Sequence, residues 1–242
     1  MTLAGLRVLV TRAEEDAPEL EALLRERGAE PVRMPCIAFE DGPDLDRICS
    51  WVKDAEVDLV VVASPHAARR LVALCGEIRV PLAAVGAATA RELPGDALVP
   101  GEGTGAEALL RHLRGQVSGR RVLVPRAEGG NPALVHGLRA AGAQVEALTL
   151  YRTVTARRAA PAGLRALADG AIDAITFASG SAAHGFAELA GAASVGRAGV
   201  ACLGKQAADE ARKASIRVDA VADGGLIELC DAAALAVRVR KR

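Results

Sequence analysis

The feature that most constrains the fold is a strand followed at once by a helix, in residues 58–74 (DLVVVASPHAARRLVAL). The aliphatic and β-branched run at residues 59–63 is typical of a buried strand. Ser64 is a preferred N-cap residue and Pro65 suits the first turn of a helix, so residues 67–74 are expected to be helical. Such a turn leaves free backbone N–H groups and the positive end of the helix dipole beside the sheet. That arrangement favours the binding of anions.

The same pattern recurs at residues 173–189 (DAITFASGSAAHGFAEL), with Asp, Ala-Ser, Ala-Ala and Leu at a constant offset. Gly180 stands where the first copy has proline, which leaves one more N–H group at the turn. No spacing suggests a histidine partner for Ser64, Ser179 or Ser181. We therefore interpret them as helix caps that can also contact an anion, rather than as nucleophiles. Two copies of one anion-binding turn indicate two domains that face a common ligand.

The repeat extends over most of the chain. Residues 122–143 (VLVPRAEGGNPALVHGLRAAGA) repeat residues 8–29 (VLVTRAEEDAPELEALLRERGA), and residues 200–213 repeat residues 83–93. Strands alternate with helices throughout, which predicts parallel sheets with right-handed crossovers. We therefore predict an α/β fold built from a duplicated two-part unit. The sequence leaves open which part of each copy shares a domain.

Hydrophobic runs and helix breakers predict the individual elements. Strands are expected at residues 6–10, 32–39, 59–63, 82–85, 97–99 and 145–150. Helices are expected at residues 18–27, 45–53 and 67–74 and within residues 86–95. Trp51 is expected to pack inward. The segment GEGTG at residues 101–105 lacks the full GxGxxG spacing and a ribose-binding acid, so we interpret it as a loop in which Thr104 caps the next helix.

Composition excludes several classes of function. The net charge is zero and only 2% of the 242 residues are aromatic, which argues against nucleic acid and anionic membranes as partners. No apolar run reaches membrane-spanning length, no signal peptide is found, and no histidine spacing fits a metal site. The cysteines are odd in number, scattered, and never spaced CxxC, which favours reduced, buried thiols in a cytoplasmic protein. They are Cys36, Cys49, Cys75, Cys202 and Cys230.

Three further side chains are candidates for a site. Arg12 and Arg126 occupy equivalent places just after the first strand of each copy, where a crevice is expected and a guanidinium can bind a carboxylate. The alternative is a solvated arginine. Tyr151, the sole tyrosine, ends the strand expected at residues 145–150. It is either a packing or hinge residue or a proton donor.

Short motifs in a consistent order make the chain resemble the uroporphyrinogen-III synthase family over nearly its whole length. They are Val-Leu-Val-Thr-Arg (8–12), Val-Ala-Ser-Pro (62–65), Val-Gly-x-x-Thr-Ala (85–90), Leu-Tyr-Arg-Thr-Val (150–154), Phe-x-Ser (177–179) and Leu-Gly (203–204). The resemblance implies two flavodoxin-like domains joined by two crossing linkers, with a cleft between them. Domain 1 would comprise residues 1–38 and 155–242, and domain 2 residues 39–154. The linkers would lie near residues 38–41 and 153–155.

The resemblance also implies an activity. The enzyme would be a lyase of haem biosynthesis that cyclises the linear tetrapyrrole hydroxymethylbilane to uroporphyrinogen III, losing water and inverting the last ring through a spiro intermediate. It would need no metal or organic cofactor, and we expect a monomer. The substrate carries eight carboxylates, which suit repeated N–H-rich turns, and would come from the preceding enzyme of the pathway. The alternative is a non-catalytic two-domain small-molecule-binding or sensor module.

Site residues carry over position by position. The resemblance makes Tyr151 the general acid that helps the hydroxyl leave. With the positions singled out above, the expected substrate-binding residues are Arg12, Ser64, Pro65, Gly86, Thr89, Arg126, Ser179, Gly180, Ser181, Gly204 and Gln206. This chain has Ala207 where the family's second Gly-x-x-Thr-Ala has threonine, so Gln206 or the backbone must make that contact. Ser-Gly-Ser at residues 179–181 also replaces a more usual Ser-Pro or Ser-Asn.

Overall fold

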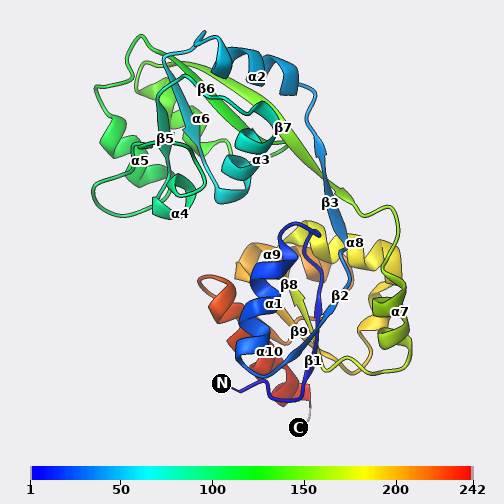
Figure 1. Ribbon diagram of the computed structural model, residues 1–242. Helices are drawn as coiled ribbons and strands as arrows, with labels where there is room; N and C mark the ends of the chain where they lie inside the picture. Colours follow the sequence, from blue (N-terminus) through cyan, green and yellow to red (C-terminus); the bar gives the residue numbers. More distant parts are fainter. Residues whose placement is uncertain (1, 241–242) are drawn as a thin grey trace. The chain divides into compact units, whose positions relative to one another are not determined.

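Residues 2–240, which the computed structural model describes, form two five-stranded β-sheets in two units (Figure 1). Unit 1 comprises Met1–Phe39 and Thr153–Arg242, and unit 2 comprises Glu40–Arg152. The chain therefore passes between the units twice, once within strand β3 (Ile37–Asp41) and once within strand β7 (Gln144–Thr155). Within the described residues, no helix combines the length and apolarity needed to span a bilayer.

The sheet of unit 1 has the strand order β10-β9-β8-β1-β2, and all its pairs are parallel. Its strands are β1 (Arg7–Val10), β2 (Glu30–Arg33), β8 (Ala174–Phe177), β9 (Gly199–Leu203) and β10 (Ala220–Ala222). Counted along the chain within this unit, the order is 5-4-3-1-2, which is one of the two common orders of doubly wound sheets. In such a sheet ligands bind outside the carboxyl ends of the strands.

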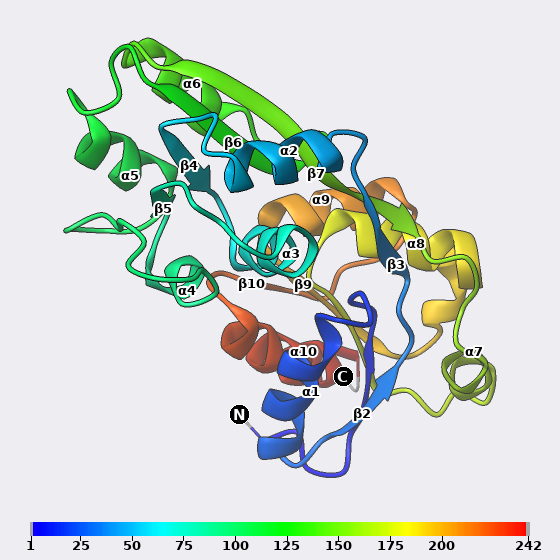
Figure 2. The same ribbon diagram turned by 45° about the horizontal axis from the view of Figure 1, so that its top comes forward.

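Helices cover both faces of this sheet, because its strands are apolar on both sides. On one face the core joins the sheet to α7 (Pro161–Ala168), α8 (Gly180–Ala190), the 3-10 helix η1 (Ala192–Val195) and α9 (Gly204–Lys213). On the other face it joins the sheet to α1 (Ala17–Glu26) and α10 (Leu226–Arg240). Helices α1 and α10 are neighbours in both views (Figure 1, Figure 2).

The sheet of unit 2 has the order β3-β7-β6-β4-β5. Its remaining strands are β4 (Leu59–Val62), β5 (Leu82–Ala84) and β6 (Arg121–Ala127). Its helices are α2 (Leu45–Lys53), α3 (Pro65–Cys75), α4 (Ala87–Ala90), α5 (Ala106–Leu113) and α6 (Ala133–Ala140). Helices α5 and α6 share one apolar core with β4 and β6, and α2 packs against α3. Helix α2 has the expected bounds, and Trp51 on it is buried as expected.

One aspartate in each unit ties the repeated strand–helix segment to its neighbouring strand in the same way. In unit 1 the Arg7 N–H donates to Asp173 Oδ2 at 2.9 Å, and in unit 2 the Arg121 N–H donates to Asp58 Oδ2 at 2.8 Å. In return the Asp173 and Asp58 N–H groups donate to the carbonyls of Arg7 and Arg121, each at 2.9 Å. Equivalent positions of the sequence repeat therefore make equivalent hydrogen bonds.

The strand predictions for residues 32–39 and 145–150 were wrong. Residues 32–39 are not one strand, because β2 ends at Arg33 and β3 begins at Ile37 in the other sheet. Pro35 lies between them and cannot donate to a strand ladder. Tyr151 does not end its strand, since β7 continues to Thr155. The apolar run stops at residue 151, but the strand continues because it carries the chain from unit 2 into unit 1.

The loop at residues 101–105 also differs from its prediction. Thr104 does not cap α5, whose N-cap is Gly105 with a φ of +91°. Its hydroxyl donates instead to the Val85 carbonyl at 3.3 Å. The strand expected at residues 97–99 is only an isolated bridge between Leu98 and Ala83. Proline and glycine on both sides of residues 97–99 keep this segment too short for a regular ladder.

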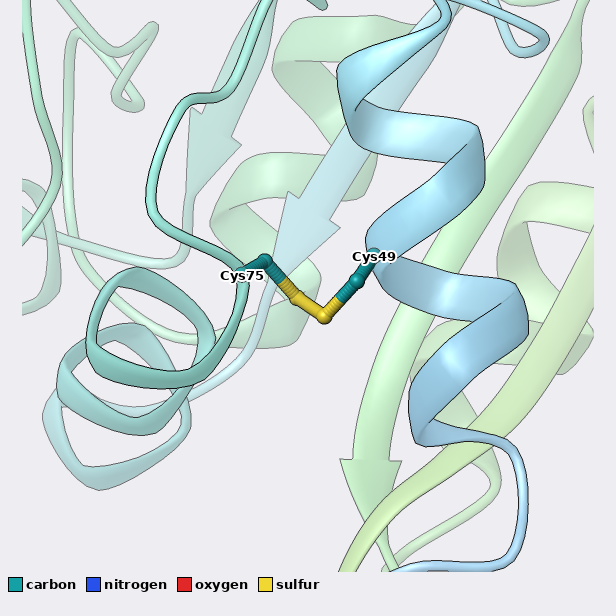
Figure 3. The surroundings of a disulfide bond; sticks show 2 residues. All are labelled: Cys49 and Cys75. Atoms are coloured by element: carbon teal, nitrogen blue, oxygen red, sulfur yellow. A yellow bond between two sulfur atoms is a disulfide. The ribbon is translucent and has the colours of Figure 1, made fainter.

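The expectation of five reduced cysteines was wrong for two of them, since Cys49 of α2 and Cys75 of α3 form a disulfide (Figure 3). Their Cα atoms are 4.7 Å apart although 26 positions separate them in the sequence. A spacing test such as CxxC cannot find a pair that helix packing brings together. The other three thiols are buried as expected, and burial raises the pKa of Cys36 and of Cys202 to about 12. Those two thiols are therefore protonated and unreactive at neutral pH.

Glu21 on α1 makes the stability of unit 1 sensitive to acid. This buried carboxylate accepts hydrogen bonds from Arg33 Nη2 at 2.8 Å and Arg25 Nη2 at 3.1 Å. The hydrogen bond from Arg33 is the main cause that lowers the pKa of Glu21 below its ordinary value of 4.5; burial opposes it and Arg25 reinforces it. Because the unfolded chain then binds the proton more readily, this contribution is complete above about pH 4.5 and is lost as the pH falls through the lowered pKa.

We therefore expect Glu21→Gln to be less sensitive to acid than the unsubstituted protein. Urea unfolding at neutral pH and at about pH 3 measures the difference in free energy of unfolding between the two conditions for each protein. The Gln variant should lose less stability between them. A variant that loses as much as the unsubstituted protein would show that Glu21 does not carry this dependence.

Candidate functional site

The repeated turn of unit 1 opens into a cavity of about 420 Å³ beside the first turns of α8 and α9. Its walls are Ala178, Ser179, Gly180, Ser181, His184, Leu203, Gln206, Ala207 and Glu210. A second cavity of about 240 Å³ shares part of this wall and adds Arg12, Asp16, Phe39 and Thr153. Five of the expected substrate-binding residues in unit 1 therefore line neighbouring hollows at the carboxyl ends of β1, β8 and β9. They are Arg12, Ser179, Gly180, Ser181 and Gln206.

The equivalent turn of unit 2 borders a cavity of about 260 Å³. Its walls are Ala63, Ser64, Ala67, Val124, Pro125, Arg126, Ala127, Gly130, Asn131, Leu134, Val135 and Tyr151. The structure thus brings together three expected site residues, namely Ser64, Arg126 and Tyr151, from α3, β6 and β7. Most of the other walls are apolar, so the few polar groups lie in a setting that strengthens their interactions.

Ser64 and Ser179 are N-caps, as predicted. Ser64 Oγ accepts from the Ala67 N–H at 3.1 Å and Ser179 Oγ accepts from the Ala182 N–H at 3.2 Å, and both residues have extended backbones. The cap leaves other N–H groups of the first turn without helical partners, and these are the groups that can bind an anion.

Loss of either cap is expected to destabilise the protein. Ser64→Ala and Ser179→Ala each remove the acceptor for a first-turn N–H, which costs about 1 kcal/mol of unfolding free energy. Urea unfolding measures this change, and the matched Ser→Asp variants keep an acceptor and should stay within about 0.5 kcal/mol of the unsubstituted protein. Equal losses in the Ala and Asp variants would contradict the capping role.

The two arginines are engaged rather than freely solvated. Arg12 is half-buried and lies 3.7 Å from Asp16 Oδ2 and 4.0 Å from Glu19 Oε2. Arg126 Nη2 donates to the Gly130 carbonyl, in a bend of the chain beyond β6. Both guanidinium groups are therefore held at the cavity walls, where further N–H groups remain for a ligand.

Four expected binding residues do not line these three cavities: Pro65, Gly86, Thr89 and Gly204. Thr89 on the short helix α4 is buried, with 2% exposure. At Gly86 an added Cβ would lie 2.5 Å from Thr104 Oγ1, so glycine there permits the close approach of the loop. Gly204 begins α9 with a φ of +76°, a conformation that glycine adopts most readily.

Two side chains of the larger cavity were not expected as binding residues. His184 Nε2 lies 2.9 Å from Glu210 Oε2, which links α8 to α9. Hydrogen bonds from Lys213 and then from His184 lower the pKa of the Glu210 carboxyl. An added Cβ at Gly180 would lie 2.5 Å from Glu210 Cβ, so glycine there makes room for this residue. Helical spacing is the sequence signal that could have found these two residues. His184 lies four residues after Gly180 and Glu210 four residues after Gln206, so each lies on the same helix face as an expected site residue.

The substitution noted at Ala207 is explained in part. Ala207 is 3% exposed and forms part of the cavity wall, whereas Gln206 beside it is exposed and lines the same cavity. The amide of Gln206 is therefore available to a ligand in place of the missing hydroxyl.

Tyr151 is the most enclosed polar side chain of the unit 2 cavity, at 8% exposure. Its ring meets the His66 ring edge-on with the centroids 4.7 Å apart, and the Arg70 guanidinium lies 5.7 Å from its centroid. Among the described residues, no group of three or more His, Cys, Asp or Glu side chains could hold a metal ion. The groups present can bind carboxylates and transfer a proton.

Fold and site together define a class: α/β proteins with two parallel-sheet units, each carrying a capped, anion-binding turn at the carboxyl ends of its strands. A family described as "Uroporphyrinogen-III synthase HemD" matches residues 18–227. The chain belongs to the uroporphyrinogen-III synthase family, which confirms the resemblance inferred from the motifs.

Comparison with individual relatives points to the same family. The chloroplastic uroporphyrinogen-III synthase of Oryza sativa subsp. japonica is 26% identical over 223 residues, which are 87% of this chain and 73% of that protein. The uroporphyrinogen-III synthase of Synechococcus elongatus is 29% identical over 204 residues, covering 77% and 75% of the two chains. The crystal structure of uroporphyrinogen-III synthetase from Helicobacter pylori 26695 covers 98% of this chain and 100% of its own, with a TM-score of 0.63 and 15% identity. This last likeness supports the fold.

Proposed function

We propose that this enzyme cyclises hydroxymethylbilane to uroporphyrinogen III, with loss of water and inversion of the last pyrrole ring through a spiro intermediate. Family membership supports the reaction class, that of a lyase in tetrapyrrole biosynthesis. The observation that carries the proposal for this chain is the unit 2 cavity, where Tyr151 shares an enclosed, mostly apolar space with Arg126 and the Ser64 turn.

In this proposal Tyr151 is the general acid. Its phenol proton passes to the terminal hydroxyl of the substrate, the carbon–oxygen bond breaks, and water leaves with the bonding electrons. The phenolate remains on Tyr151, and the pyrrole ring stabilises the carbon cation that forms. The substituted α carbon of the last pyrrole ring bonds to this cation and gives the spiro intermediate. The bond from that α carbon to its original methylene bridge then breaks, and the released bridge carbon bonds to the free α carbon of the inverted ring. That carbon loses its proton in the final step, which restores the phenol. Apolar walls such as Val124 and Leu134 exclude bulk water, which would otherwise capture the cation.

The capped turns are the proposed carboxylate-binding groups. The first turns of α3 and α8 offer backbone N–H groups, and Arg126 and Arg12 lie in the cavities beside them. Gln206, Gly180 and Ser181 add donors in unit 1. Pro65, Gly86, Thr89 and Gly204 stay candidates on the strength of the family motifs alone.

Several expectations stay predictions. They are the cleft between flavodoxin-like domains, the monomeric state, the cytoplasmic location, the receipt of substrate from the preceding enzyme, and turnover without a cofactor. The Cys49–Cys75 disulfide bears on the location, because disulfides are rare in reducing compartments. Fractionation of the native cells, with alkylation of free thiols at lysis, tests location and redox state together.

Genetic complementation tests the proposed function. A bacterial strain without its own uroporphyrinogen-III synthase should grow without added haem when it expresses this chain. Folded, soluble protein that fails to restore growth would contradict the proposal. If that protein still binds the linear tetrapyrrole, the non-catalytic binding module replaces the enzyme; no observation on this chain favours that module at present.

A further inference from the structure

Arg70 on α3 is held against the ring of Tyr151. Its guanidinium carbon lies 5.7 Å from the ring centroid, and its side chain is 16% exposed. Nη2 donates to Asp41 Oδ1 at 2.6 Å, which fixes the guanidinium from the side of β3. Arg69, the preceding residue, pairs instead with Glu92 at 3.2 Å. Of these two neighbouring arginines, Arg70 is the one that lies over the tyrosine ring.

Three elements place charged or titratable groups close to Tyr151. Helix α3 contributes Arg70 and His66, whose ring meets the tyrosine edge-on. Strand β6 contributes Arg126, which lines the same cavity, and strand β3 contributes Asp41 through its ion pair with Arg70. The Asp41 side chain is 53% exposed, so water screens its charge more than that of the enclosed guanidinium. The contact with the enclosed Arg70 guanidinium therefore favours a negative charge on the tyrosine.

We propose that Arg70 is a positioning residue for Tyr151: it holds the ring in place and stabilises the phenolate that exists after the tyrosine has given up its proton. Arg70 itself transfers no proton. When the Tyr151 O–H bond breaks and the leaving hydroxyl takes the proton, the phenolate that remains has this guanidinium 5.7 Å from its ring centroid. The catalytic consequence rests on the proposed function, whereas the effect on phenol ionisation does not.

The sole tyrosine of the chain makes this effect directly measurable. Ultraviolet absorbance of tyrosinate, followed during an alkaline titration of the folded protein, reports Tyr151 alone. Arg70→Gln should raise the midpoint of tyrosinate formation by about one pH unit, because a cation at this distance favours the charged form. Arg70→Lys keeps a positive charge and should restore most of the shift. Circular dichroism at each pH shows that the folded protein is being titrated.

Two controls separate electrostatics from structural damage. Arg69→Gln removes the same charge from the same helix and should leave the midpoint within about 0.3 pH unit of the unsubstituted protein. Asp41→Asn breaks the Arg70–Asp41 ion pair but keeps the guanidinium, so the midpoint of tyrosinate formation should not rise. An unchanged midpoint in Arg70→Gln, or an equal rise in Arg69→Gln or Asp41→Asn, would overturn the proposal.

Turnover supplies the second readout. Arg70→Gln should lower kcat for the type III isomer about tenfold, with a smaller change in KM, and Arg70→Lys should recover most of it. If unsubstituted protein forms type III isomer but the midpoint does not move in Arg70→Gln, the role of Arg70 fails and the proposed function stands. If the midpoint moves but no protein forms type III isomer, the phenolate contact stands and the proposed function fails.

Discussion

Tyr151→Phe is expected to lower the rate of type III isomer formation about 100-fold or more, because general acid catalysis typically contributes at least this factor. The substitution removes one oxygen atom and keeps the ring, so its packing against His66 and Arg70 persists. The loss should appear mainly in kcat, since a group that acts on the leaving hydroxyl stabilises the transition state more than the bound substrate. Initial rates from a coupled assay with isomer separation measure it.

A control is needed because the tyrosine is nearly buried. The Phe variant should have the same circular dichroism spectrum as the unsubstituted protein and a free energy of unfolding within about 0.5 kcal/mol of its value. Slow turnover in a folded variant assigns the proton to Tyr151. Turnover at the original rate would remove Tyr151 from the acid role and leave it as a packing residue of β7.

The second large effect concerns stability. Phe177→Ala is expected to cost about 3–5 kcal/mol of unfolding free energy, the usual range for a fully buried phenylalanine. Phe177 is inaccessible at the end of β8, and its ring meets that of Phe186 on α8 edge-on at a centroid distance of 5.5 Å. This pair joins the strand to the helix that follows the Ser179 turn. Its loss therefore weakens the support of the anion-binding turn as well as the core.

Urea unfolding of Phe177→Ala measures this cost, and Val221→Ala is the matched control. Val221 on the edge strand β10 is 41% exposed, so its truncation should change the free energy of unfolding by no more than about 0.5 kcal/mol. Similar losses in the two variants would show that the apolar core between β8 and α8 is not a main source of stability in unit 1.

The parts of the fold that sequence predicts well are those set by neighbouring residues. The Ser64 and Ser179 caps depend on a side chain and an N–H group three residues later, so the two strand–turn–helix segments were visible in the sequence. The bounds of α2 followed from its amphipathic pattern for the same reason. The order and spacing of the short motifs were enough to indicate the family.

The errors come from contacts between distant residues. Packing of α2 on α3 brings Cys49 to Cys75, and no local pattern records that pairing. Sheet membership separates β2 from β3, although both lie in one apolar stretch interrupted by Pro35. In the candidate site, the contact of His184 with Glu210 and that of Arg70 with Tyr151 both join different elements, so neither was expected.

The most direct test of the proposed cyclising activity is the isomer composition of the product. Hydroxymethylbilane is generated in place, protein is added in increasing amounts, and the oxidised products are separated into type I and type III isomers. Spontaneous ring closure gives only type I. We predict that the type III fraction rises with added protein and that heat-denatured protein gives none. Type I alone, in the presence of folded protein, would contradict the assignment of this chain as the cyclising enzyme.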